Sequence, residues 1–127
     1  MADFTDFSIT LTRGDTRRFR FTVKDPSTGA LADITTWQKF WVTARYNTWD
    51  SNAAPVFVLT SDSQGLALID PVNGLVEGTL SPTHTAGLTS QEWILYGDIQ
   101  GKDGAGNIWT ISRGHFIVLP DVTFVTS

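Results

Sequence analysis

Cysteine is absent from the 127-residue sequence, so neither disulfides nor thiolate metal sites are possible. Charge is sparse as well: Asp, Glu, Lys and Arg make up 17% of the residues, and the formal net charge is −4. A net negative chain is a poor partner for nucleic acid or for an anionic membrane surface. No apolar run approaches the roughly 20 residues that a membrane-spanning helix needs. We therefore predict neither a nucleic-acid partner nor a membrane partner.

The first residues, MADFTDF, lack the basic start and the apolar stretch of a signal peptide. This pattern predicts a soluble protein that is made in a cytoplasm. Hydrophobic residues make up 41% of the sequence, which is a globular composition, and the length fits a single domain.

Short segments in which apolar and polar residues alternate dominate the sequence. The clearest is RRFRFTVK at 17–24, which places Phe19, Phe21 and Val23 on one face. Turn signals such as Asn73-Gly74 separate such segments. Eight or nine short strands predict an all-β fold, either an antiparallel sandwich or a barrel. The other candidate strands are 7–11, 37–46, 55–60, 66–70, 74–81, 92–100 and 107–119.

One short helical turn is predicted near residues 82–87. Ser81 can cap it, Pro82 suits the first helical position, and Gly87 can end it. We expect a single β-sandwich domain at 8–120, with an N-terminal arm at 1–7 and a C-terminal arm at 121–127.

Arg13-Gly14-Asp15 spells the tripeptide that integrins bind on exposed loop tips. It lies between the predicted strands that end near Leu11 and begin near Thr16. Gly14 can adopt a positive φ, and Asp15 can bond a nearby backbone N–H, so both residues favour a tight turn. We interpret the tripeptide as a turn that joins the first two strands in a hairpin.

The order of several short motifs resembles that of small bacteriophage virion proteins, in particular the N-terminal modules of phage baseplate upper proteins and related tail or neck components. The resemblance covers residues 8 to 123 and implies an immunoglobulin-like β-sandwich that serves as a virion building block without chemistry of its own. Gly97 departs from the pattern, because such strands tend to carry a bulkier residue there. The matching motifs are ITLTRGDTRRFRFTVKDPSTG, then Asp33-Ile34-Thr35, then Gly74, Val76, Leu80, Ser81, Thr85 and Leu88, then Tyr96-Gly97-Asp98-Ile99-Gln100, and finally Thr110, Gly114, Phe116, Val118 and Asp121-Val122-Thr123.

Residues that could carry chemistry are scattered. His84 and His115 lie in different segments without neighbouring ligands at metal-site spacing. The loop GKDGAGN at 101–107 lacks the ending of a phosphate-binding loop and the alternating carboxylates of a calcium loop. No nucleophile-elbow motif is present. We therefore predict no enzymatic activity, no catalytic residues, no metal and no cofactor.

Aromatic residues offer the better functional signal. Trp41 and Arg45 share the strand face opposite Phe40 and Val42, and both residue types are enriched at protein interfaces. Trp49 lies in a long loop, and the two ends carry apolar residues that a finished sandwich does not need. The predicted interface residues are Phe4, Phe7, Trp41, Arg45, Trp49, Phe124 and Val125.

These observations predict a structural component of a phage tail, baseplate or neck, located in the virion after synthesis in the host bacterial cytoplasm. It would form homo-oligomers and dock onto other phage structural proteins, the tail, neck or major capsid protein among them. Capsid decoration is the closest alternative. A carbohydrate-binding module is an alternative of another class, and it requires that Trp41 or Trp49 face solvent. A hydrolase is the third class, and no motif favours it.

Overall fold

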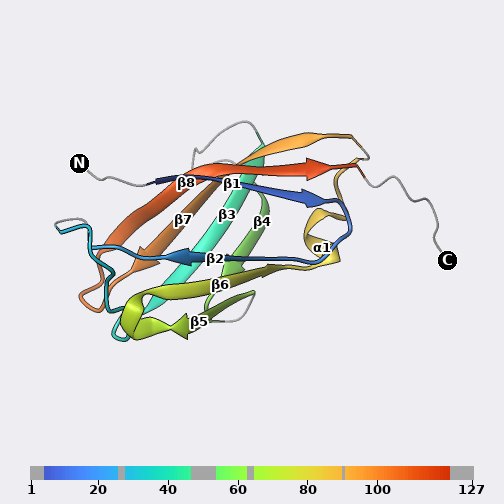
Figure 1. Ribbon diagram of the computed structural model, residues 1–127. Helices are drawn as coiled ribbons and strands as arrows, with labels where there is room; N and C mark the ends of the chain where they lie inside the picture. Colours follow the sequence, from blue (N-terminus) through green and yellow to red (C-terminus); the bar gives the residue numbers. More distant parts are fainter. Residues whose placement is uncertain (1–4, 26–27, 47–53, 63–64, 90, 121–127) are drawn as a thin grey trace.

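The computed structural model describes residues 5–25, 28–46, 54–62, 65–89 and 91–120. This part of the chain is all-β, with eight strands in two sheets, one 3-10 turn and one turn of α-helix (Figure 1). The predicted fold class, at the level of an all-β protein with two sheets, is thereby confirmed. The elements are β1 (Thr5–Thr12), β2 (Arg17–Thr22), β3 (Lys39–Tyr46), β4 (Pro55–Thr60), β5 (Leu66–Asp70), η1 (Pro71–Asn73), β6 (Leu75–Leu80), α1 (Pro82–Thr85), β7 (Trp93–Lys102) and β8 (Ile108–Leu119).

The larger sheet has the strand order β1-β8-β7-β3-β4, and the smaller sheet has the order β2-β6-β5. Among the described strands, neighbours are antiparallel with one exception: β1 runs parallel to β8 and pairs with it from Thr5↔Ser112 to Thr12↔Leu119. The expectation of a purely antiparallel fold is therefore wrong at this position. Residues 5–7 of the expected N-terminal arm lie within β1, which begins at Thr5.

The tight turn at Arg13-Gly14-Asp15 is confirmed, but the hairpin is wrong. Asp15 N–H donates to the Thr12 carbonyl at 3.0 Å, and Gly14 has a φ of 84°. The turn leads from β1 in the larger sheet to β2 in the smaller sheet, so the two strands do not pair. A period of two shows which face of a strand is apolar, whereas it does not show which strand lies beside it.

The turn is anchored on α1, which lies beyond the end of β6 (Figure 1). Gly14 N–H donates to Oγ1 of the fully buried Thr85 at 2.9 Å, and Arg13 Nη1 donates to the Ala86 carbonyl at 3.2 Å. The helix begins at Pro82, as predicted, and Ser81 N–H donates to His84 Nδ1 at 2.9 Å. The bond to His84 satisfies the backbone N–H of the capping residue.

The core between the two sheets is centred on the fully buried ring of Phe116. This ring meets Phe7, Phe19 and Phe57 edge to face, with ring centroids 5.3, 6.0 and 5.1 Å apart. Such geometry is the favourable arrangement for aromatic pairs. The four rings come from β1, β2, β4 and β8, so they tie the two sheets together.

Candidate functional site

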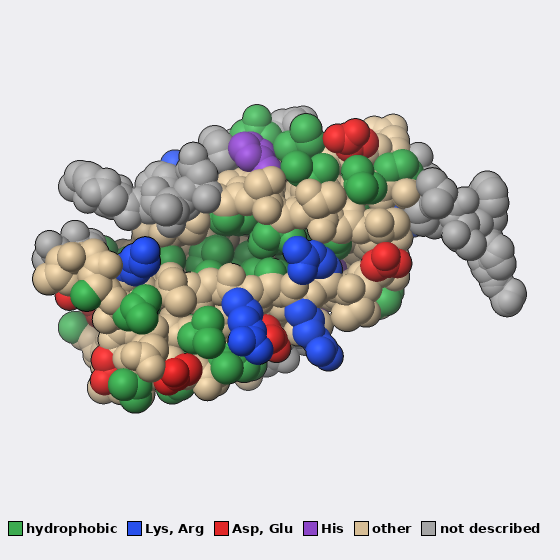
Figure 2. Space-filling view, in the orientation of Figure 1, with side chains coloured by type: hydrophobic (Ala, Val, Ile, Leu, Met, Phe, Trp, Pro, Cys, Tyr) green, Lys and Arg blue, Asp and Glu red, His purple; other side chains and the backbone are tan. Residues whose placement is uncertain are grey.

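A groove of about 540 Å³ lies between the sheets where β1 faces β2. Figure 2 shows it as a hollow with hydrophobic side chains at its floor and Lys or Arg side chains along its lower rim. The floor is formed by Phe7 and Ile9 of β1, Phe19 and Phe21 of β2, and Ile99 of β7. Phe19 and Ile99 are buried, whereas Phe7, Ile9 and Phe21 are half-buried. The apolar core thus continues to the surface at this edge.

Both strands that border the groove are edge strands. Among the strands that the structure describes, β1 pairs with β8 alone and β2 pairs with β6 alone. An edge strand presents backbone N–H and C=O groups that can pair with another extended chain. The groove therefore combines two open strand edges with an apolar floor.

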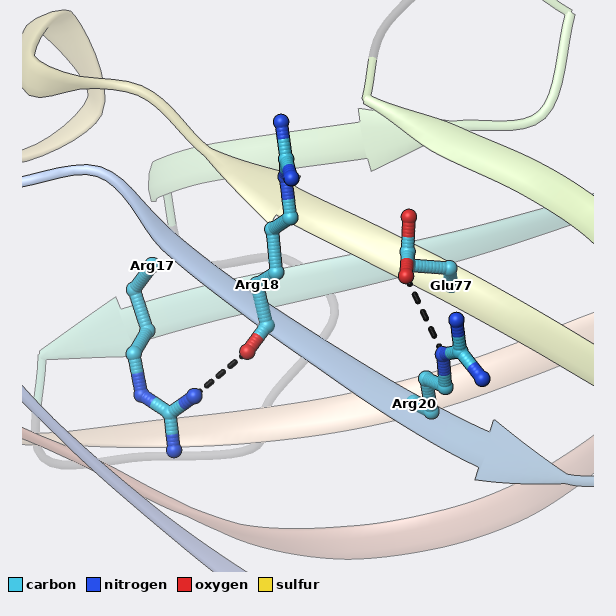
Figure 3. A network of polar contacts seen from close by, with 4 residues as sticks. All are labelled: Arg17, Arg18, Arg20 and Glu77. Carbon is cyan, nitrogen blue, oxygen red and sulfur yellow. Dashed lines mark hydrogen bonds and ion pairs between the residues drawn. The ribbon is translucent and has the colours of Figure 1, made fainter.

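Three arginines of β2 give the groove a cationic rim (Figure 3). Arg17 Nε donates to the Thr10 carbonyl of β1 at 3.2 Å, and its Nη1 donates to the Arg18 carbonyl. This side chain thus spans from β2 to β1. Arg20 Nε lies 3.1 Å from Glu77 Oε2 of β6, and the Arg20 side chain is 58% exposed, so the pair contributes little stability.

The arrangement suits an extended peptide better than a small ligand. Main-chain bonds to a strand edge provide affinity in this mode of recognition, and alternate side chains of the added strand enter the apolar floor. With three Arg and one Glu among the residues that line the groove, an acidic side chain on the added strand would be attracted to the rim.

The opposite face of the larger sheet holds the predicted pair Trp41 and Arg45. Trp41 lies opposite Phe40 and Val42, as predicted, but it is half-buried and its Nε1 donates to Gln100 Oε1 of β7 at 2.8 Å. Its indole N–H is therefore already bonded within the chain.

Arg45 lies on the same face, but it is only 9% exposed in the single chain. Its Nη1 lies 3.6 Å from Oδ2 of the buried Asp98 on β7. Burial raises the pKa of Asp98, while the charges of Arg45 and Arg113 lower it. The two strands bring the opposite charges together, and that pairing accounts for a buried arginine on the outer side of a sheet.

The other predicted interface residues divide into two groups. Phe7 lies within β1 and packs against Phe116, so it belongs to the sandwich and to the groove floor rather than to an arm. Phe4, Trp49, Phe124 and Val125 lie outside the described residues.

The two histidines are separate. His84 lies in α1, while His115 lies on β8 with its ring centroid 4.9 Å from that of Tyr96. Within the described ranges, no three His, Cys, Asp or Glu side chains are grouped so that they could hold a metal ion. In the same part of the chain, no helix is long and apolar enough to cross a membrane.

Two features were not foreseen from the sequence. The groove was missed because it depends on β1 and β2 lying in different sheets. Trp109 was missed as a surface residue: it is 43% exposed, and its Nε1 donates to Asp103 Oδ2 at 2.9 Å. This bond and the backbone N–H groups of Asn107 and Ala105 lower the pKa of Asp103.

No protein-family model matches the sequence, and no curated protein matches it significantly.

Proposed function

We propose that this chain is a non-enzymatic structural component of a bacteriophage tail, baseplate or neck, and that it acts by self-assembly and by docking onto other virion proteins. The observation that carries the proposal is the groove between β1 and β2, in which an apolar floor reaches the surface beside two strand edges that no other described strand covers. Such a surface is suited to strand addition by a neighbouring protein.

The positions of the motif residues support the resemblance to phage virion modules. Ile34, Val76, Leu80 and Thr85 are all fully buried, and Gly74 has a φ of 72° that only glycine adopts readily. These residues hold the scaffold together, so the resemblance concerns the fold rather than a reactive site.

The strand order supports the immunoglobulin-like assignment as well. In immunoglobulin variable-type domains, strands G, F, C and C′ form one sheet, and strands A, B, E and D form the other. Here β8-β7-β3-β4 corresponds to the first set, and β2-β6-β5 corresponds to B, E and D. β1 lies beside β8, and the position of strand A beside β2 is not filled by a described strand.

Mass spectrometry of purified phage particles, separated into heads and tails, tests the proposed function. We expect this chain in the tail fraction at a fixed ratio to other tail proteins. Recovery in the head fraction would instead indicate the decoration role. Absence from both fractions, despite synthesis in infected cells, would refute a structural role in the virion.

A further inference from the structure

We propose that the groove between β1 and β2 receives residues 121–127 of a second copy of this chain as an added strand. The inference rests on the proposed function, because it names the contact through which the chain assembles. It also rests on the position beside β2 that an immunoglobulin-like sheet fills with strand A and that no described strand fills here.

The sequence of the segment fits the groove floor. Residues 121–127 read DVTFVTS, and all but Asp121 and Ser127 are β-branched or aromatic types that favour strands. Successive side chains of a strand point to opposite faces, so Val122 and Phe124 share one face while Asp121, Thr123 and Val125 share the other. With Val122 and Phe124 directed inward, two apolar side chains meet the half-buried Phe7, Ile9 and Phe21.

The charges of the two parts are complementary. The chain as a whole carries a net charge of −4, yet the groove is lined by Arg17, Arg18 and Arg20 against the single acid Glu77. Arg20 is paired with Glu77, while Arg17 bonds backbone carbonyls of Thr10 and Arg18. A carboxylate is a stronger hydrogen-bond acceptor for a guanidinium than a neutral carbonyl is. Arg17 can therefore exchange a bond to a backbone carbonyl for a bond to the Asp121 carboxylate of the added strand.

The geometry favours a second copy over the chain's own segment. β8 ends at Leu119, whose carbonyl accepts a bond from Arg13 N–H at 2.9 Å. The turn that contains Arg13 therefore lies between this end of β8 and the groove, and β1 lies between β8 and β2. Seven extended residues span about 23 Å, and a strand as long as β2 needs about 20 Å. Passing around the turn would use part of the segment's span of about 23 Å, whereas a segment from another copy does not have to follow that path.

Light scattering on the full chain, combined with size-exclusion chromatography, tests the proposal. Phe124→Asp places a charge against the apolar floor, and Val125→Asp is the matched control on the opposite face of the same segment. We expect an oligomer for the full chain and for Val125→Asp, and a monomer for Phe124→Asp and for the chain without residues 121–127. Circular dichroism on each variant verifies that the fold is retained.

A peptide of sequence DVTFVTS, labelled for fluorescence anisotropy, then tests whether the segment binds in the groove. It should bind the Phe124→Asp chain, and Arg17→Glu in that chain should weaken binding at least about tenfold, the scale of one lost charge-assisted hydrogen bond. A full chain that is monomeric, or an oligomer that persists in Phe124→Asp, overturns the proposal. Failure of the peptide to bind also overturns it, because the groove then has another occupant.

Virion fractionation separates this inference from the proposed function. A monomeric chain that is nevertheless present in tails would refute strand exchange and leave the structural role intact. An oligomer that is lost in Phe124→Asp but absent from all particles would support strand exchange and refute the virion role.

Discussion

Gly97 and Gly114 lie opposite each other in the β7–β8 pair, and the ring of Phe116 occupies the space above Gly97. A Cβ at position 97 would lie 2.6 Å from Phe116 Cε2. This contact explains why position 97 carries glycine: the aromatic centre of the core leaves no space for a larger residue.

Gly97→Ala should therefore destabilise the protein by about 1–3 kcal/mol, the usual cost of an overpacked core. Urea denaturation followed by tryptophan fluorescence measures the change. Gly87→Ala is the control, since a Cβ there has no atom within 4 Å. Equal stabilities of the two variants would show that Phe116 does not fill this space.

Because Arg45 and Asp98 interact, we expect the stability changes caused by substituting each of them to be strongly non-additive in a double-mutant cycle. Arg45→Met deprives the buried Asp98 carboxylate of the ion-pair partner whose Nη1 lies 3.6 Å from Oδ2, and it should cost about 3 kcal/mol. The double variant Arg45→Met/Asp98→Leu should recover most of that loss, because two apolar side chains replace two buried charges. Additive effects in thermal or urea unfolding would mean that the two side chains do not interact.

We expect the folded protein to lose stability in mild acid because of His84. Burial lowers the pKa of His84, so the unfolded chain binds the proton more readily than the folded chain does. The stabilising contribution of the neutral ring is complete above the unfolded pKa of about 6.5, and it is lost as pH falls from there through the folded pKa.

His84→Gln tests this behaviour, because glutamine at the third helical position also accepts the bond from the capping residue's N–H. Melting temperatures between pH 8 and pH 5, a range chosen around the pKa of about 6.5, should fall less steeply for the variant. Parallel curves for the two proteins would assign the acid sensitivity to other groups.

Thr85→Val removes the acceptor that holds the Arg13-Gly14-Asp15 turn. Valine has nearly the same shape, so the main loss is the bond from Gly14 N–H to Thr85 Oγ1, worth about 1–2 kcal/mol when the donor is left unsatisfied. Thr89→Val, at an exposed position between α1 and β7, is the control and should change stability by less than about 0.5 kcal/mol. If the control costs as much as Thr85→Val, the anchoring bond has no special role.

Local features of the fold were predictable from the sequence. The alternation of Phe19, Phe21 and Val23 located β2, and Ser81-Pro82 located the start of α1. Pairing was less predictable, because β1 and β8 are parallel and neighbours only in space. The burial of Arg45 could not be predicted for the same reason, because its ion-pair partner Asp98 is more than fifty residues away and is brought near only by the β3–β7 pairing, in which Asp98 lies opposite Thr43. The groove could not be predicted at all without knowing that β1 and β2 lie in different sheets.

The parallel pairing of β1 with β8 also constrains biosynthesis. Its partners are more than a hundred residues apart, so the larger sheet stays incomplete until the ribosome has released the segment through Leu119. Until then β1 lacks its strand partner β8, and the aromatic rings that finally surround Phe116 remain exposed to water. We expect the nascent polypeptide to be at its most vulnerable to proteases and to self-association in that interval, and to acquire resistance in one late step.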